Sequence, residues 1–347
     1  MNVGLAVITP GVHTTVQDFG RPGFQQFGVP VSGALDNVSL RLANGLVGNS
    51  RNTAGLEILY RGPILEVAAE RVNLAVGGFG ASIKLLRTVE DRVPAWQTVS
   101  LEHGAQFEIV LGDKSNVCYL AIEGGLDLPP ALGSLSTYTR SGLGGYKGRP
   151  LAKGDIVPLK LRSVRSKDPT GYARFPASRL DNPIRCSWGI QTEYFTERSL
   201  QSFLSEPFMI LPESDRMGYR LLGPRMEHVG GYDIISDGVA AGAIQVPGNG
   251  NPIVLLADRQ TTGGYPKIAN IISADLPAMG RCRPGQKIRF EIIDVEEAEH
   301  IRRAQEFDLQ IIERSISPVS SGGAVDLGAL YIENLISGVV GGHEGLD

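Results

Sequence analysis

Short runs in which apolar and polar residues alternate recur along most of the chain. Clear examples lie at residues 56–60, 64–67, 72–76, 107–110 and 288–292, and glycine or proline bounds most of them. Alternation with a period of two, interrupted by turn residues, is typical of short strands with one buried face. The pattern therefore predicts a mainly β protein.

Two short segments have the period of helices instead. Asp36 is a candidate N-cap for a helix whose apolar positions include Leu42 and Leu46 and which ends near residues 45–48. Residues 196–205 form a second candidate, which Pro207 ends. A short polar residue before the first turn and a proline after the last are typical helix boundaries.

A longer helix is predicted over residues 296–312. Ile301, Ala304, Phe307 and Ile311 recur at helical spacing among charged residues. One apolar stripe on an otherwise charged helix predicts a surface helix that covers the core.

The order of elements is repeated along the chain. The first copy places an Asp-Phe-Gly-Arg turn at 18–21 before strands at 54–58, 62–67 and 104–109, and the second places Asp215-Arg216 before strands at 241–246, 251–256 and 285–290. A repeat on this scale indicates related structural units. We predict β units at 1–162 and 183–314, a charged linker with prolines at 163–182 and a partly flexible tail at 315–347.

Composition supports a folded chain of one large or two ordinary domains. It has 347 residues, of which 42% are hydrophobic and 20% charged, so it can bury a core. Its 44 glycines and 21 prolines fit many turns between short strands. A net charge of -4 argues against binding to nucleic acid, whose phosphates attract basic surfaces.

Several classes of site are not expected. The chain has no P-loop, no GxGxxG, no GxSxG and no Met-Lys-Met sequence for covalent biotin. Its three cysteines lie far apart and its histidines lack metal-ligand spacing, so we expect no disulfide framework and no metal site. Without a signal sequence or a long apolar run, we expect a cytoplasmic protein that does not span a membrane.

The stretch at 257–267 has the greatest density of polar side chains. A guanidinium fork matches a carboxylate, and a side-chain amide can donate to and accept from a lactam or urea. Paired glycines let backbone N–H groups approach a ligand. The alternative is a polar hairpin whose glycines only make the turn. The predicted catalytic residues are Arg259, Gln260, Thr262, Tyr265 and Lys267, and Gly263 and Gly264 are predicted to contact substrate.

Two further stretches are candidate parts of the substrate site. Residues 133–149 combine hydroxyls, arginine and glycines, although they also read as a long surface loop. Residues 17–36 hold a tight turn across which Asp18 and Arg21 could simply pair with each other. If the two units pack face to face, these loops line one cleft between them. The predicted substrate-binding residues here are Asp18, Arg21, Ser32, Tyr138, Arg140, Asp215 and Arg216.

These motifs, in this order, resemble those of the KipA, or allophanate hydrolase subunit 2, family. That family includes the C subunit of prokaryotic 5-oxoprolinase and is similar to part of the carboxyltransferase region of urea carboxylase. The matching motifs run from about residue 7 to 293 and lie at 15–21, 32–36, 43–44, 123–125, 133–134, 214–218 and 258–266.

The resemblance implies two cyclophilin-like β-barrel units and a multi-subunit enzyme. The implied reaction is the ATP-dependent opening of 5-oxo-L-proline to L-glutamate, with a KipI-like B subunit and a LamB/YcsF-like A subunit as partners. ATP would be bound by the complex, since this chain has no P-loop.

Two other functions fit the same resemblance. The chain could be a carboxyltransferase component that moves a carboxyl group from carboxybiotin, carried on another protein, to urea or another small amide. It could also be a KipA-like regulator that acts by binding a KipI-like partner. The sequence does not separate these three functions.

Overall fold

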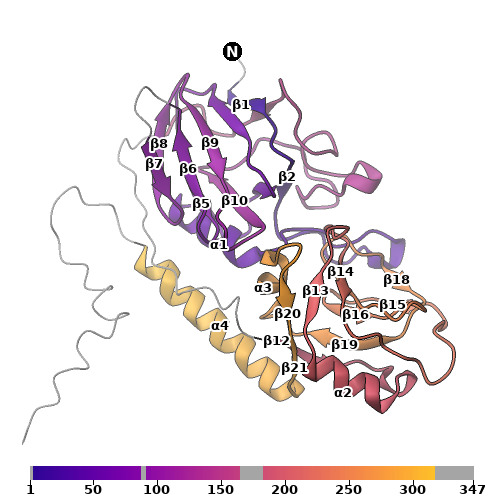
Figure 1. Ribbon diagram of the computed structural model, residues 1–347. Coiled ribbons are helices and arrows are strands. Elements are labelled where there is room, and N and C mark those ends of the chain that lie inside the picture. Colours follow the sequence, from indigo (N-terminus) through magenta and orange to yellow (C-terminus); the bar gives the residue numbers. More distant parts are fainter. Residues whose placement is uncertain (1–2, 87–90, 165–182, 317–347) are drawn as a thin grey trace, which may run out of the picture.

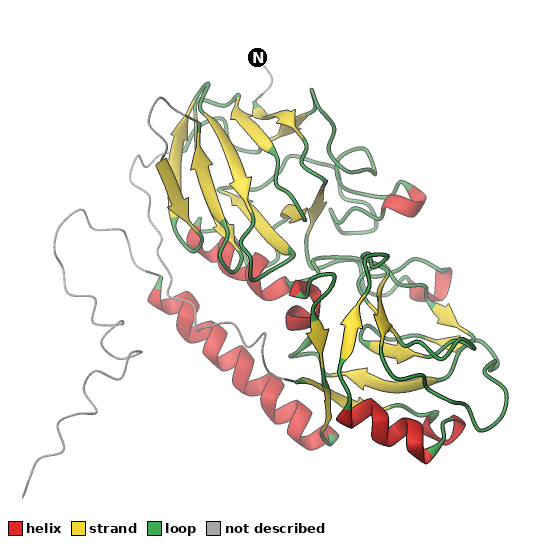
Figure 2. Ribbon diagram, viewed as in Figure 1, coloured by secondary structure: helices red, strands yellow, loops and turns green. Residues whose placement is uncertain are grey.

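The computed structural model describes residues 3–86, 91–164 and 183–316. Within them the chain is mainly β, as predicted, and the strands form two units that lie one above the other in Figures 1 and 2. The predicted linker lies almost wholly outside these residues, as does the predicted tail beyond residue 316. The domain boundaries therefore stay predictions.

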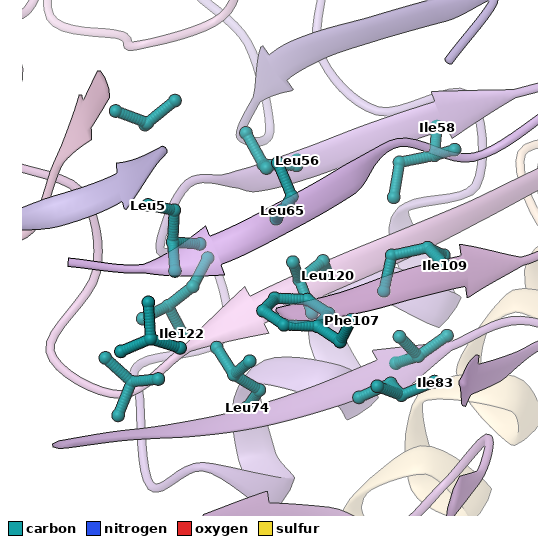
Figure 3. Packing of buried hydrophobic residues seen from close by; sticks show 14 of the residues in the cluster. Leu5, Leu56, Ile58, Leu65, Leu74, Ile83, Phe107, Ile109, Leu120 and Ile122 are labelled. Atoms are coloured by element: carbon teal, nitrogen blue, oxygen red, sulfur yellow. The ribbon is translucent and has the colours of Figure 1, made fainter. Parts of the chain in front are cut away.

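The first unit consists of two sheets that face each other. Their strand orders are β11-β1-β4-β9-β6-β7 and β2-β3-β10-β5-β8. Figure 3 shows side chains such as Leu65 and Phe107 from one sheet packed against Leu74 and Leu120 from the other. The strands are β1 Gly4–Thr9, β2 His13–Gln17, β3 Gly55–Leu59, β4 Ile64–Val67, β5 Arg71–Gly77, β6 Ser82–Leu85, β7 Asp91–Pro94, β8 Thr98–Glu102, β9 Gln106–Val110, β10 Val117–Ile122 and β11 Ile156–Pro158.

The second unit is built around one eight-stranded sheet. Its order is β20-β13-β14-β17-β16-β19-β12-β21, and β15 and β18 form a separate two-stranded ribbon. Phe203 and Phe290 stack in its core with ring centroids 4.7 Å apart. The strands are β12 Ile184–Trp188, β13 Phe208–Ile210, β14 Gly218–Leu222, β15 Asp237–Gly238, β16 Ala243–Gln245, β17 Ile253–Leu255, β18 Thr262–Gly263, β19 Lys267–Ile271, β20 Lys287–Ile288 and β21 Phe290–Ile292.

Both short predicted helices are confirmed, and so is Asp36 as the N-cap of the first. Helix α1 (Asn37–Leu46) begins after Asp36, whose carboxylate accepts from the Ser39 amide, and α2 (Glu197–Ser205) begins after Thr196, which accepts from the Ser199 amide. The sequence prediction missed α3 (Leu276–Arg281), which is short and contains a proline and a glycine. Gly280 is required there, because a Cβ would lie 2.5 Å from the Leu35 carbonyl oxygen.

Helix α4 (Val295–Ser315) is the predicted covering helix, but it turns a different face inward. Leu309 and Ile312 are buried, whereas Phe307 and Ile311 are exposed. Figure 1 shows α4 running alongside both units. Its rotation is fixed by polar contacts that its apolar spacing does not reveal, including the bond from the Gln305 amide to the Ala274 carbonyl at 2.8 Å. No helix in the described residues is long and apolar enough to cross a membrane.

A shared apolar cluster joins the units. Leu35, Leu40 and Tyr119 from the first unit belong to the same buried cluster as Ile210 and Met279 from the second. The relative position of the units is therefore set by packed side chains. The three cysteines, Cys118, Cys186 and Cys282, are free and buried.

Candidate functional site

A pocket of about 440 Å³ lies where the two units and α4 meet. This size and a position between units are typical of small-ligand sites. Its walls come from the loops after β2 and β17 and from helices α1, α3 and α4. The lining residues used below are Ser32, Arg41, Arg51, Arg259, Arg302 and Glu306.

Arg259 is a buried cation in this pocket. Only 5% of the residue is exposed, and its guanidinium donates to the backbone carbonyls of Val239 (3.0 Å) and Leu256 (3.3 Å). No carboxylate in the described residues lies within 4.0 Å of it. Burial accordingly lowers the pKa of Arg259 below its ordinary value. Because buried charges are normally paired, this arginine has the character of an anion-binding group.

Ser32 contributes an unused hydroxyl to the same pocket. The residue is 6% exposed, and its Oγ has no hydrogen-bond partner among the described residues. It adopts a left-handed backbone with φ of 56°, and its amide donates to the Ala257 carbonyl at 3.1 Å. That bond joins the loop after β2 to the loop that carries Arg259. A strained residue with an unsatisfied buried hydroxyl is typical of a functional site.

The charge of the pocket favours an anion. Four arginines line it (Arg41, Arg51, Arg259 and Arg302), against the single carboxylate of Glu306. Glu306 lies 2.6 Å from Arg41, 3.5 Å from Arg51 and 3.6 Å from Arg302, so the one acid is shared. An excess of positive charge in a hollow of a net negative protein attracts small anions.

A buried ion network holds the loop of Arg259 in place. The preceding residue, Asp258, accepts from Arg216 at 2.8 and 3.0 Å, and Arg216 also contacts Glu57 of β3 and the Gly33 carbonyl. Glu57 accepts in turn from the Leu35 amide (2.9 Å) and the Tyr119 hydroxyl (2.7 Å). Burial by itself would lower the pKa of Arg216, but the carboxylates of Asp258 and Glu57 raise it overall. The network connects both units directly behind the pocket.

The wall formed by α4 is held by Arg41. This arginine donates to both oxygens of Glu313 at 2.7 Å and to Glu306 at 2.6 Å. Its guanidinium, with smaller help from Gln310 and Arg302, holds the pKa of Glu306 at about 2 against the usual 4.5. Glu306 is therefore ionised at neutral pH, and we call the contacts of Arg41 with Glu306 and Glu313 the clasp.

Lowering the pH from about 5 toward 2 is expected to weaken this clasp. A carboxylate whose folded pKa is depressed stabilises the protein fully above its unfolded pKa of 4.5, and that contribution disappears as the pH falls through about 2. We expect Glu306 to account for a loss of roughly 1–3 kcal/mol over this range. Denaturant midpoints of the wild type and Glu306→Gln at both pH values measure it, with exposed Glu299→Gln as the control. An equal loss in the wild type and Glu306→Gln would contradict the assignment.

The other residues of the 257–267 stretch lie apart from the pocket lining. Thr262 and Gly263 form β18, and the Gln260 amide lies 3.4 Å from the Gln245 side-chain oxygen. The buried Lys267 ammonium lies 3.7 Å from Asp237 and has no hydrogen-bond partner in the described chain. The structure thus separates Arg259 from Gln260, Thr262, Gly263, Gly264, Tyr265 and Lys267, which surround the β15–β18 ribbon and are absent from the pocket lining.

Asp18 and Arg21, both in the described chain, do not form the ion pair that the sequence suggested. Asp18 accepts from the Ser134 hydroxyl (2.6 Å) and the Leu135 amide (2.7 Å), while Arg21 donates to the Ala131 and Ser136 carbonyls. Both residues therefore anchor the loop at 131–136. The predicted pairing of Asp18 with Arg21 across the turn is wrong. Their actual partners lie more than 100 residues away along the chain, where the local sequence gives no sign of them.

The remaining predicted substrate residues do not line the pocket either. Tyr138 is half-buried and precedes the short 3-10 helix Thr139–Ser141, in which Arg140 is exposed. Asp215 accepts from the Met217 amide in a turn, and Arg216 is fully engaged in the ion network. Of the predicted residues, the pocket brings together Arg259 and Ser32.

Three residues of the pocket were not predicted from the sequence, namely Arg51, Arg302 and Glu306. Arg302 and Glu306 lie on the polar side of α4, whose charged residues look like those of any solvent-exposed helix face. Arg51 lies in a turn after α1. No local motif marks them. Their only signal is the one-turn spacing of Arg302 and Glu306, which is common on exposed helices.

Comparison with known proteins agrees with this architecture. Residues 27–292 match the family described as carboxyltransferase domain, subdomain A and B. The chain is 37% identical over 304 residues to the C subunit of 5-oxoprolinase from Escherichia coli (strain K12), covering 87% of this chain and 95% of that protein.

Solved structures show the same fold within longer chains. The Kluyveromyces lactis urea carboxylase is similar with a TM-score of 0.81 at 26% identity, over 94% of this chain and 30% of that one. TTHA0988 is similar with a TM-score of 0.72 at 35% identity, over 83% of this chain and 56% of that one. Fold, motif order and sequence similarity together show that this chain belongs to the carboxyltransferase family of subdomains A and B.

Proposed function

We propose that this chain is a subunit of an ATP-dependent 5-oxoprolinase complex and that it captures the carboxylate of 5-oxo-L-proline. The observation that carries the proposal is Arg259, a buried guanidinium with no carboxylate partner in the described residues, at the wall of a pocket of about 440 Å³. Similarity to the C subunit of 5-oxoprolinase supports the substrate class.

The pocket offers complementary contacts for such a substrate. The fork of Arg259 suits a planar carboxylate, and the Ser32 hydroxyl can donate to it or to the lactam oxygen. Leu256, Ala257 and Leu276 provide apolar contacts for the ring. The role of this chain is then to hold and orient the lactam in a site with little water, where oriented donors stabilise developing charge.

ATP fits the described part of this chain poorly. The backbone amides at the start of a helix are the usual phosphate site, but the first turns of α1, α2 and α4 are capped by Asp36, Thr196 and Asp294. Two of these caps are carboxylates, which repel phosphate. We therefore propose that ATP is bound with the other subunits, a KipI-like and a LamB/YcsF-like chain.

A carboxyltransferase is the second candidate. The similarity to urea carboxylase with a TM-score of 0.81 favours it. The pocket would then hold a small amide as acceptor, and biotin would arrive on another protein.

Reconstitution separates the two candidates. We expect the chain mixed with its two proposed partners to release glutamate from 5-oxoproline only when ATP is present, with ADP formed in equal amount. Omitting this chain is expected to lower the rate of glutamate release at least about 100-fold, because the carboxylate site is lost. Consumption of carboxybiotin in the presence of urea, without glutamate release from 5-oxoproline, would refute the first candidate and establish the second.

A further inference from the structure

Two arginines lie at the mouth of the pocket, apart from the buried Arg259. Arg51 follows α1 in the first unit and Arg302 belongs to α4, and both line the pocket of about 440 Å³. Their side chains are 62% and 46% exposed, whereas only 5% of Arg259 is exposed. They therefore lie where the pocket opens to solvent. We call Arg51 and Arg302 the mouth pair.

The mouth pair approaches one carboxylate from two different elements. Arg51 lies 3.5 Å and Arg302 3.6 Å from different oxygens of Glu306. A charge-assisted hydrogen bond between such groups is shorter, at about 2.7–2.9 Å. Neither guanidinium donates a hydrogen bond within the described residues. The donors of both arginines are therefore available to a ligand.

Glu306 does not neutralise the mouth pair, because Arg41 already holds this acid. Arg41 donates to Glu306 at 2.6 Å and to both oxygens of Glu313 at 2.7 Å. The carboxylates of Glu306 and Glu313 thus oppose the four arginines that line the pocket. Two positive charges stay unmatched in this part of the described chain, one on Arg259 and one on the mouth pair.

This distribution of charge favours a ligand with two anionic ends. A monocarboxylate pairs with Arg259 and leaves the mouth pair unmatched, whereas a dicarboxylate can pair with both. Val38, Leu276 and Pro277 also line the pocket, and their apolar side chains suit the methylene groups between two carboxylates. Guanidinium groups bind carboxylates through paired hydrogen bonds. The expected ligand class is therefore a short aliphatic dicarboxylate.

We propose that the mouth pair is a second anion subsite, which binds the second carboxylate of a small dicarboxylate whose first carboxylate lies at Arg259. The identity of that ligand rests on the proposed function. Opening 5-oxo-L-proline with one water breaks the C–N bond, turns the ring carbonyl into a carboxylate and leaves an ammonium on the α carbon. The product, L-glutamate, thus has the second carboxylate that the lactam lacks. The mouth pair therefore holds the product in the pocket and makes glutamate an inhibitor.

Isothermal titration calorimetry of glutarate binding to the full-length chain tests the subsite. The matched ligand is glutaramate, in which an amide replaces one carboxylate. We expect the wild type to bind glutarate at least about fivefold more tightly than glutaramate, because each exposed ion pair contributes modestly. Arg51→Ala/Arg302→Ala should bind the two ligands within about twofold of each other, since the pairs are lost. Both side chains are substantially exposed, so the double variant should fold.

Arg303→Ala is the control for a general effect of charge. Arg303 follows Arg302 on α4 and pairs with Glu299 at 2.8 Å. Its side chain is 80% exposed and does not line this pocket. Its loss removes one positive charge from the same helix and should leave the preference for glutarate unchanged. Added salt should reduce the preference of the wild type, because exposed charges are screened.

Inhibition of the reconstituted complex tests the role of the subsite in holding the product. We expect L-glutamate to slow ADP formation at a concentration about fivefold lower than L-glutamine, which has an amide in place of the second carboxylate. Both amino acids carry the same α-ammonium and α-carboxylate, so the comparison isolates the group that the mouth pair binds. The double variant should lose this difference.

The outcomes distinguish this proposal from the proposed function. Equal binding of glutarate and glutaramate by the wild type, or no binding of glutarate, would overturn the subsite. A preference that the double variant keeps, or that Arg303→Ala also loses, would overturn it as well. Equal inhibition of an active complex by L-glutamate and L-glutamine would overturn the product as its ligand. A chain that prefers glutarate through the mouth pair, in a complex that releases no glutamate, would refute the 5-oxoprolinase proposal alone.

Discussion

Replacing Arg216 with alanine is expected to destabilise the protein by about 3–5 kcal/mol. Arg216 is buried and is the common partner of two buried carboxylates, Glu57 and Asp258. Without it these acids have no compensating cation, and their loss of solvation is no longer offset. Because Glu57 belongs to the first unit and Asp258 to the second, the contact between units should weaken as well. Denaturant unfolding followed by circular dichroism measures the loss.

A neighbouring arginine provides the control. Arg220 lies on β14 with its side chain exposed, and Arg220→Ala should change stability by no more than about 0.5 kcal/mol. Adding Asp258→Asn to Arg216→Ala should recover part of the loss, since one of the two unpaired charges is removed. An Arg216→Ala protein as stable as Arg220→Ala would show that the network does not support the fold.

Much of the fold could be predicted because its signals are local. The alternation at 72–76 predicts a strand from its own residues, and Asp36 caps α1 through a bond to Ser39, three residues away. The same holds for Thr196 and Ser199 at α2. Helix α3 escaped prediction because six residues with a proline and a glycine carry no periodic signal.

The pairing of charges could not be predicted. The repeat gave Arg21 and Arg216 equivalent places, yet Arg21 donates to backbone carbonyls of a loop whereas Arg216 pairs with two acids. Glu57 and Arg216 are 159 positions apart, and nothing in either segment marks the other as its partner. Likewise, the inward face of α4 depends on Arg41, which lies on a helix of the first unit.

Only part of the candidate site could be predicted, because its residues also come from segments that are distant in the sequence. Density of polar groups singled out the stretch at 257–267, but density does not tell which side chains share a cavity. Arg259 lies in the turn before β18 and reaches the pocket, whereas Thr262 and Gly263 pair with β15 in the ribbon. One continuous sequence motif therefore supplies both a pocket residue and a strand of the ribbon.

Arg259→Ala is expected to lower kcat/KM for 5-oxoproline in the reconstituted complex by about 100-fold or more. Loss of a buried charged partner costs about 2–5 kcal/mol, and each 1.4 kcal/mol corresponds to a factor of ten. The change should appear mainly in KM if Arg259 holds the carboxylate equally in the bound and transition states. Arg259→Lys should recover little, because an ammonium lacks the planar fork. Initial rates of glutamate release measure both variants.

A lactam without a carboxylate gives the sharpest test of this role. We expect 2-pyrrolidone to be a poor substrate of the wild type. It should react no more slowly with Arg259→Ala, because it has no carboxylate for the guanidinium to bind. Arg302→Ala, which also lines the pocket but is exposed and shares Glu306, should reduce turnover of 5-oxoproline less than tenfold. If Arg259→Ala slowed both lactams equally while its melting temperature stayed at the wild-type value, the arginine would act on the ring amide or on assembly, and carboxylate capture would have to be assigned to another residue.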